Sequence, residues 1–316
     1  MGEESLFSGI QGESIFDRLS TVIGWDKQLK NITIKCLNKH HISINSGQKR
    51  THGDDSVYVT RNPYIPDQIE VVHIQVKHTK NKYPAKQTLI NKFKSYISEL
   101  HDIIECAQYS QEIEGIIDSI PKAETNRVIH RGVLAWFCSS DPNCPSIIPE
   151  LLKLEYPHNK KGIALLDNSR ANFLYDIIRY MNIHSQDDLF TQWSYYHPSM
   201  NLSCIQKESR TSTELPIFSL TSGMISMKVI KNVNNSEGLY LFSPEPFSRE
   251  NLLRCLHCGF SLLSGWGKFL RIGFSDFNGN DSAHQKIEQT ALTAYKKEYE
   301  VMPFTYKPNI ITSTDV

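Results

Sequence analysis

The stretch "DDSVYVTRNPYIPDQIEVVHIQVKHTK", residues 54–80, predicts a β-hairpin at the centre of the fold. Residues 55–60 and 70–79 are rich in valine and isoleucine, as strands are. The segment "RNPYIPDQ" between them contains the prolines and the asparagine that are typical of a turn. A hairpin brings the start of its first strand beside the end of its second, so residues about twenty positions apart should meet.

The polar residues of this hairpin are unusual for a packed strand and are typical of a metal-binding or catalytic site. Because residues i and i+2 of a strand point to one face, Gln75 and Lys77 should project together, opposite Asp55 of the first strand. Mg²⁺ prefers oxygen ligands, which the Asp55 carboxylate, the Gln75 amide and the Val76 carbonyl can supply. Lys77 could stabilise charge on a phosphate, or help to position and deprotonate the attacking water. Asp54 precedes Asp55 directly, so the pair leaves open which carboxylate is the ligand.

Outward from the hairpin, the first part of the chain alternates between helical and strand patterns. It predicts a helix at 12–25, a strand at 31–37, the two hairpin strands, a helix at 88–110, a strand at 128–140, a helix at 145–156, a strand at 161–168 and a helix at 170–181. This order predicts an α/β layer protein with a mixed sheet flanked by helices.

Beyond about residue 190 the pattern starts again, which predicts a second, smaller α/β domain. We expect strands within 217–230, 238–243 and 268–277, and helices at 248–266, with Ser248 as N-cap, and at 282–300. The segments 191–204 and 209–216 resemble connecting loops. The expected domains are therefore residues 1–190 and 191–316.

Composition limits the class of protein and its compartment. Of 316 residues, 40% are hydrophobic and 22% are charged, as in ordinary globular proteins. No apolar run reaches the roughly 18 residues of a membrane span, and the N-terminal residues do not resemble a signal peptide. Seven scattered cysteines suit a reducing compartment better than a disulfide framework. We expect a cytoplasmic protein without membrane attachment.

Charge is distributed unevenly although the formal net charge is zero. Residues 27–96 contain 13 Lys or Arg and 4 Asp or Glu, a local charge of +9, and the rest of the chain carries 21 against 30, or −9. A solvated lysine-rich surface would also produce such a block, but its overlap with the hairpin favours contact with phosphate. The candidate nucleic-acid contacts are Arg50, His52, His78, Lys80 and Lys82.

The cysteines offer a different metal site. Cys255 and Cys258 form a CxxC pair, and Cys138 and Cys144 could complete four zinc ligands. However, Cys255 and Cys258 belong to a leucine-rich helical pattern, in which buried structural cysteines are common. A zinc-stabilised regulatory module therefore stays a minor alternative.

In the hairpin and the helix before it, the chain resembles the PD-(D/E)XK nuclease superfamily, whose core is a helix, a three-strand meander, a helix and a strand. "HGDD" supplies the aspartate, "QVK" supplies the final triplet with Gln75 where Glu or Asp is commoner, and Glu13 in "QGES" matches the additional metal-binding carboxylate of many members. Together with "IGW", "VKHTKNKYP" and "FKSYISELHDIIEC", these motifs are similar to the nuclease subunit of GAPS-type two-gene antiphage defence systems. This resemblance covers roughly the first 180 residues.

The resemblance implies a restriction-endonuclease-like fold and a DNA endonuclease that depends on Mg²⁺ or Mn²⁺. Glu13, Asp55, Gln75 and the Val76 carbonyl would hold the metal, and Lys77 would assist attack on the scissile phosphate. It also implies a complex with a second protein from a neighbouring gene, or an assembly of identical chains, with residues 191–316 in docking or regulation. The alternative is a nucleic-acid-binding subunit whose glutamine-bearing site no longer cleaves.

Overall fold

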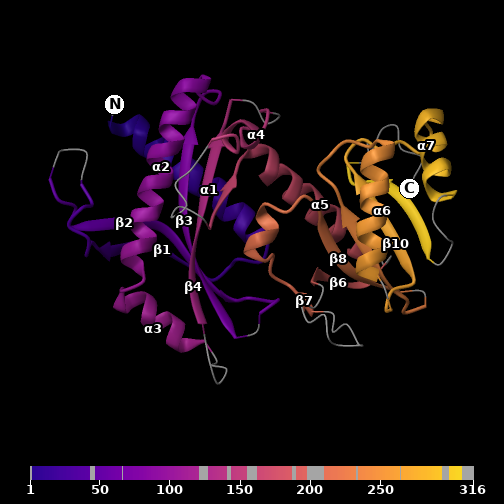
Figure 1. Cartoon of the computed structure of the whole chain (residues 1–316), viewed down its shortest axis with the longest axis horizontal. Coiled ribbons are helices and arrows are strands. Elements are labelled where there is room, and N and C mark those ends of the chain that lie inside the picture. The colour runs from indigo at the N-terminus through magenta and orange to yellow at the C-terminus, as the bar shows by residue number, and fades with distance from the viewer. Residues whose placement is uncertain are drawn as a thin grey trace. The chain divides into compact units, whose positions relative to one another are not determined.

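The computed structural model describes residues 2–42, 47–65, 67–120, 127–140, 144–154, 162–186, 190–197, 210–232, 234–263, 265–293 and 299–307. The chain divides into two compact units, Met1–Asn172 with Pro216–Thr221, and Phe173–Leu215 with Ser222–Val316. Each unit contains its own β-sheet, as the colours of Figure 1 show. The predicted mixed α/β class is confirmed. Within the described ranges, every helix is too short or too polar to span a bilayer.

The first sheet is built around the predicted hairpin, and its strands lie in the order β1-β2-β3-β4-β5. They are β1 (Gln28–Lys35), β2 (Thr51–Arg61), β3 (Gln68–Thr79), β4 (Arg127–Cys138) and β5 (Ile163–Leu166). β1, β2 and β3 form an antiparallel meander, whereas β3, β4 and β5 run parallel. β3 is the central strand, and its side chains are buried from Gln68 to Gln75. Polar groups on this strand therefore need partners within the protein.

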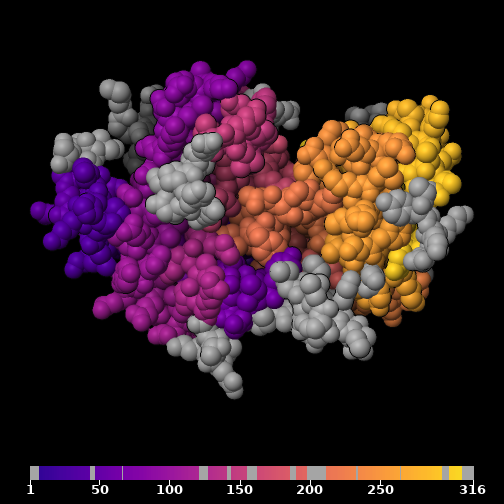
Figure 2. All heavy atoms as spheres, in the orientation of Figure 1, coloured from indigo at the N-terminus to yellow at the C-terminus, as the bar shows by residue number. Residues whose placement is uncertain are grey.

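Helices cover both faces of this sheet. Gly12 of α1 (Gly2–Val22) approaches Val76 and His78 of β3, whereas Lys77, which alternates to the other face, contacts α2 (Lys86–Ala107). Figure 1 accordingly shows α2 in front of the sheet and α1 behind it, and the outer side chains of α2 contribute to the purple surface in Figure 2. The remaining helices that begin in this unit are α3 (Gln111–Ser119), α4 (Ile148–Leu151), α5 (Asn168–Gln186) and the 3₁₀ helix η2 (Ile217–Leu220).

Helix α2 forms because its apolar residues recur every three or four positions. Those buried are Leu89, Phe93, Ile97, Leu100 and Ile103, which belong to two core clusters with apolar side chains of β2, β3 and β4. Burial of one such side chain contributes about 1.5–3 kcal/mol. This packing fixes the rotation of α2 about its axis, and hence which of its polar residues face the end of β3.

The second sheet has the strand order β11-β10-β9-β8-β6-β7. Its strands are β6 (Phe190–His197), β7 (Arg210–Ser212), β8 (Ile225–Lys231), β9 (Glu237–Phe242), β10 (Phe269–Phe274) and β11 (Glu300–Thr305), accompanied by α6 (Arg249–Leu263) and α7 (Ser282–Thr293). As predicted, Ser248 caps α6, because its Oγ accepts the N–H of Asn251 at 3.1 Å. β9, β10 and β11 are parallel, whereas β9, β8, β6 and β7 are antiparallel.

Several predictions for the second half were wrong. Segments 191–204 and 209–216 were expected to be loops, but they contain β6 and β7. The aromatic residues of β6 are typical of a strand. However, its main partner β8 lies some thirty residues further along the chain, so no nearby strand and turn marked this segment as part of a sheet. Residues 217–220 form η2 rather than the start of a strand. The final helix was expected to reach residue 300, but Glu300 is the first residue of β11, a strand that the sequence reasoning missed. β11 is an edge strand and therefore tolerates Pro303.

The first half shows smaller differences. Of the helix expected at 145–156, the described residues form only α4 (Ile148–Leu151). α1 begins at Gly2 and not at residue 12, and it ends before Gly24, whose positive φ of 85° suits glycine. A separate helix, α3, follows α2.

Candidate active site

The hydrogen-bond ladder between β2 and β3 ends beside the two consecutive aspartates. Its last residue pair is Ser56 and Ile74. Beyond that pair, side chains replace backbone carbonyls as acceptors: the N–H of Val76 donates to Asp55 Oδ2 at 2.7 Å, and the N–H of Ile74 donates to the Asp54 carboxylate. The two strands are thus held together by carboxylates at the point where their backbones stop pairing.

Asp54 is an internal anchor. Its side chain is 1% exposed, and its Oδ2 lies 2.6 Å from Nδ1 of His73. Nε2 of His73 in turn lies 2.9 Å from Nδ1 of His130 on β4. Burial raises the pKa of Asp54, while the contact with His73 opposes this effect. Asp54 therefore joins β2, β3 and β4 and has almost no contact with solvent.

Asp55 is partly exposed and lies among charged groups. It comes directly before Ser56, the last paired residue of β2, and its carboxylate accepts the N–H of Val76. Burial raises the pKa of the Asp55 carboxyl and Glu99 raises it further, whereas the N–H of Val76 and the ammonium of Lys77 lower it. The structure therefore brings Asp55 close to Lys77, as the hairpin argument predicts.

Lys77 extends from β3 toward α2. Its Nζ lies 3.2 Å from Glu99 Oε2 and 5.0 Å from the centre of the Tyr96 ring. Its side chain is 23% exposed, so it is held on two sides and open on another. A lysine held in this way presents a localised positive charge beside Asp55.

Glu13 comes from α1, on the opposite face of the sheet. The helix can approach β3 because residue 12 is glycine: a Cβ atom at Gly12 would lie 2.7 Å from the Cβ of His78. Burial, followed by repulsion from Asp55 and Asp17, raises the pKa of Glu13. Glu13 and Asp55 therefore lie close enough to repel each other, although they belong to different elements.

The donor groups fit an oxygen-preferring divalent cation. Gln75 is 2% exposed, and its Oε1 has no hydrogen-bond partner among the described residues. A buried acceptor without a donor is costly, as are two carboxylates that repel each other. A cation near Glu13, Asp55 and Gln75 would offset both costs, and the Val76 carbonyl lies on the same strand.

Three of the five candidate phosphate contacts are exposed. Arg50 precedes β2, and Lys80 and Lys82 follow β3 only a few residues after Lys77. Their positions at the ends of the two hairpin strands keep them available to a ligand.

The two histidines in that set are engaged elsewhere. His78 Nδ1 lies 2.7 Å from the hydroxyl of Ser8, and its Nε2 lies 2.6 Å from the hydroxyl of Ser139. His52 is 4% exposed, and its Nε2 lies 3.3 Å from Nδ1 of His41. Burial lowers the pKa of both His52 and His78. Neither side chain points freely outward toward DNA.

Glu99 and Tyr96 are site residues that the sequence reasoning missed. They lie three residues apart on α2, so they share one side of the helix. The helical spacing of Phe93, Ile97 and Leu100 could have revealed which polar residues border the buried stripe. It could not have revealed that Tyr96 and Glu99, at the edge of that stripe, contact Lys77.

The four cysteines considered for zinc do not form one cluster within a unit. Cys138 and Cys144 belong to the first unit, whereas Cys255 and Cys258 belong to the second. Cys255 lies in the core of the second unit, and burial raises the pKa of its thiol to about 11. Its role is packing.

Comparison with known families agrees with this geometry. Residues 1–170 match the family described as "GAPS4 protein PD-(D/E)XK nuclease domain". No curated protein matches the chain, and no solved structure matches it. Because the matched segment is more than half of the 316 residues, the chain belongs to this family of PD-(D/E)XK nucleases.

Proposed function

We propose that this member of the GAPS4 PD-(D/E)XK nuclease family is a DNA endonuclease that requires Mg²⁺ or Mn²⁺. The observation that carries the proposal is that Lys77 lies close to Asp55 where the β2–β3 ladder ends, with the Gln75 amide oxygen, unpartnered among the described residues, two residues before Lys77. This is the arrangement expected for hydrolysis of a phosphodiester bond: oxygen donors for a cation beside a fixed positive charge.

In this proposal, Asp55, Glu13, Gln75 and the carbonyl of Val76 hold the cation. When bound, the cation neutralises negative charge that develops on the scissile phosphate. Asp55 has a second task, because its bond to the Val76 N–H orients the carboxylate before any ligand arrives. Gln75 contributes an oxygen without a charge, so Glu13 and Asp55 provide the negative charge of the set.

Lys77 provides electrostatic stabilisation in this scheme. The Glu99 carboxylate and the Tyr96 ring restrict the ammonium group to one region, which lowers the reorganisation needed when charge develops on the phosphate. The same ammonium can orient the attacking water by a hydrogen bond. Glu99 and Tyr96 are thus positioning residues.

The DNA backbone would be bound mainly through charge. Residues 27–96 carry a local charge of +9, and Arg50, Lys80 and Lys82 are exposed. Contacts of this kind are independent of sequence and weaken as salt concentration rises. His52 and His78 support the fold in this scheme.

We further propose that the nuclease is the effector of an antiphage defence complex with a second protein encoded by a neighbouring gene. Membership of the GAPS4 family supports this role. Residues 191–316 contain 12 Lys or Arg and 11 Asp or Glu, so the basic block is not part of this region, and a docking or regulatory role suits it better than DNA contact.

The deciding experiment is cleavage of plasmid and linear DNA in Mg²⁺, Mn²⁺ or EDTA, with and without the neighbouring gene product. We expect cleavage only with metal, and a rate about 10²–10³-fold lower for Lys77→Met. Lys92→Met, which removes an exposed lysine from α2, is the matched control and should keep most of the activity. DNA binding that is indifferent to EDTA, without cleavage under any condition, would favour the non-cleaving subunit instead.

A further inference from the structure

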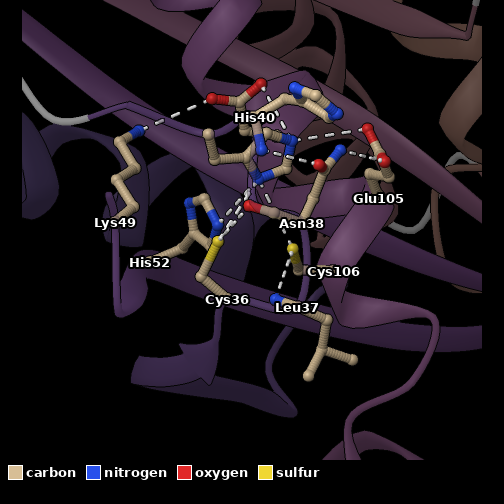
Figure 3. A network of polar contacts seen from close by, with 10 residues as sticks. Cys36, Leu37, Asn38, His40, Lys49, His52, Glu105 and Cys106 are labelled. Carbon is tan, nitrogen blue, oxygen red and sulfur yellow. Dashed lines mark hydrogen bonds and ion pairs between the residues drawn. The ribbon is translucent and has the colours of Figure 1, made fainter. Parts of the chain in front are cut away.

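Two cysteines and two histidines of the first unit, none of them assigned to cleavage, meet at one end of its sheet. Cys36 follows β1, His52 is in β2, and Cys106 is near the end of α2 (Figure 3). The fourth residue, His41, lies in the loop after β1. Their four ligand atoms lie within 4.8 Å of one another, and His41, His52 and Cys106 are buried residues. In sequence they are spread over seventy residues, so the fold alone assembles them.

The three separations from Nδ1 of His41 match the edges of a zinc tetrahedron. With Zn–S of about 2.3 Å and Zn–N of about 2.0–2.1 Å, tetrahedral ligand atoms lie about 3.3–3.8 Å from one another. Nδ1 of His41 lies 3.5 Å from Cys36 Sγ, 3.6 Å from Cys106 Sγ and 3.3 Å from Nε2 of His52. The contact between the two ring nitrogens is longer than an ordinary N–H···N hydrogen bond.

The surrounding groups orient these side chains as outer partners of a metal site do. Nε2 of His41 lies 3.4 Å from Glu105 Oε2 and 3.6 Å from Asp102 Oδ1, so its other nitrogen, Nδ1, faces the cluster. The N–H of Leu37 points to Cys106 Sγ at 3.4 Å, a contact that stabilises a thiolate. Two of the four side chains, His41 and Cys106, are thus oriented by neighbouring groups.

The charge balance also favours a metal. Two thiolates and two neutral imidazoles around Zn²⁺ give a net charge of zero, which can be buried at lower cost than an isolated ion. On binding, the two thiols each lose a proton to the solvent, and each sulfur forms a bond to zinc. Oxygen-preferring Mg²⁺ does not suit this donor set.

We propose that Cys36, His41, His52 and Cys106 bind one structural Zn²⁺ ion. Four protein ligands leave no open position for a substrate or water, as in structural zinc sites. The ion would fasten the end of β1, the start of β2 and the end of α2 to one another. His52 is three residues before Asp55 on β2, and Glu99 belongs to α2. The zinc would therefore stabilise the two elements, β2 and α2, that position Asp55 and Lys77.

The test is the metal content of the purified full-length chain after dialysis against EDTA, measured by elemental analysis. We expect about one zinc per chain, and less than about a tenth of that in Cys106→Ser and His52→Asn. Two controls should keep the zinc: Cys258→Ser, a cysteine of the second unit, and Asp55→Asn, which alters the cleavage site. Retention in Asp55→Asn separates this ion from the one proposed for catalysis.

Cobalt substitution covers the case in which a ligand variant fails to fold. The wild-type chain loaded with Co²⁺ should show the thiolate-to-cobalt charge-transfer band and the strong visible bands of a tetrahedral site. His52→Cys, which keeps four ligands, should retain metal and strengthen the charge-transfer band. A wild-type chain that lacks both zinc and these bands, or that contains a Cys36–Cys106 disulfide, would overturn the proposal.

Discussion

Two adjacent aspartates of β2 have opposite environments. Asp54 is buried against His73, and its carboxylate joins three strands. Asp55 is partly exposed, and it shares its surroundings with Glu13 and Lys77. The same side chain is therefore structural at one position and available to a ligand at the next.

This contrast predicts different effects on stability. Because the pKa of Asp55 is raised in the folded chain, its ionised form is disfavoured there at neutral pH, so Asp55→Asn in EDTA should leave Tm unchanged or raise it by about 1–4 °C. That advantage should shrink as the pH falls through the raised pKa of the folded state and be nearly gone below about 4, the ordinary value of an aspartate in the unfolded chain. Mg²⁺ should raise Tm for the wild type and not for Asp55→Asn. Thermal melts with and without metal measure both effects.

Asp54→Ala is the control for this prediction. It leaves the ring of His73 and the N–H of Ile74 without their buried acceptor, so the free energy of unfolding should fall by about 2–4 kcal/mol. An Asp55→Asn chain that is destabilised as strongly as Asp54→Ala would show that Asp55 is also a structural residue.

At the scale of elements, the approach of α1 to β3 decides whether Glu13 can reach Asp55. The two elements touch at Gly12, where a Cβ atom would lie 2.7 Å from the Cβ of His78 and 3.3 Å from Cγ1 of Val76. The Cβ of His78 cannot move away without the strand, because it is bonded directly to the backbone. Glycine is required here for space, and not for backbone conformation.

Gly12→Ala should therefore displace α1 and reduce cleavage, even though alanine is the better helix former. We expect a net loss of stability of about 1–2 kcal/mol, since overpacking outweighs the gain in helix propensity of about 1 kcal/mol. Gly9→Ala, three residues earlier on the same helix and with nothing within 4 Å, should be neutral or stabilising and keep full cleavage. Denaturation and cleavage assays on the pair measure this, and equal behaviour of the two variants would contradict the close-contact explanation.

At the scale of the whole molecule, the chain passes between its two units after residues 172, 215 and 221. The return segment belongs to the first unit: Arg170 donates to the carbonyl oxygens of Ser219 at 2.7 Å and Leu220 at 2.6 Å. Truncation near residue 190 would remove these acceptors from a nearly buried guanidinium. A docking role of the second unit is therefore better tested by surface substitutions than by deletion.

Each unit contains a histidine whose pKa burial lowers to about 4: His130 in the first and His197 in the second. In the unfolded chain a histidine takes up its proton near pH 6.5. Between pH 6.5 and 4 the unfolded state thus binds more protons, so stability is fully present above pH 6.5 and is lost as the pH falls. For His197, which is 2% exposed, the loss should reach at most about 3 kcal/mol.

Denaturant titrations at a series of pH values would measure this dependence. His197→Gln cannot titrate, so the slope of unfolding free energy against pH should decrease for the second unit. His257→Gln, which alters a histidine of α6 in the same unit, is the control and should keep the slope. An unchanged slope in His197→Gln would show that other groups cause the acid sensitivity.

Local patterns were sufficient for the first unit's sheet. The alternation and turn residues of the 54–80 hairpin predicted β2 and β3, and the spacing of Gln75 and Lys77 predicted their common face. The second unit was harder, because β6 pairs with β8 and the short β7, and such pairing depends on long-range contacts that leave a weak local signal.

The sequence by itself thus determined the α/β class, the central hairpin and the PD-(D/E)XK family motifs, since periodicity and turn chemistry are local properties. Only the tertiary structure distinguished Asp54 from Asp55, showed that Glu99 contacts Lys77 and showed that His52 is buried. It also gathered Cys36, His41, His52 and Cys106, where sequence spacing had drawn attention to other cysteines. The physical reason is the same in each case: burial and distance between residues far apart in the chain are set by how helices pack on the sheet.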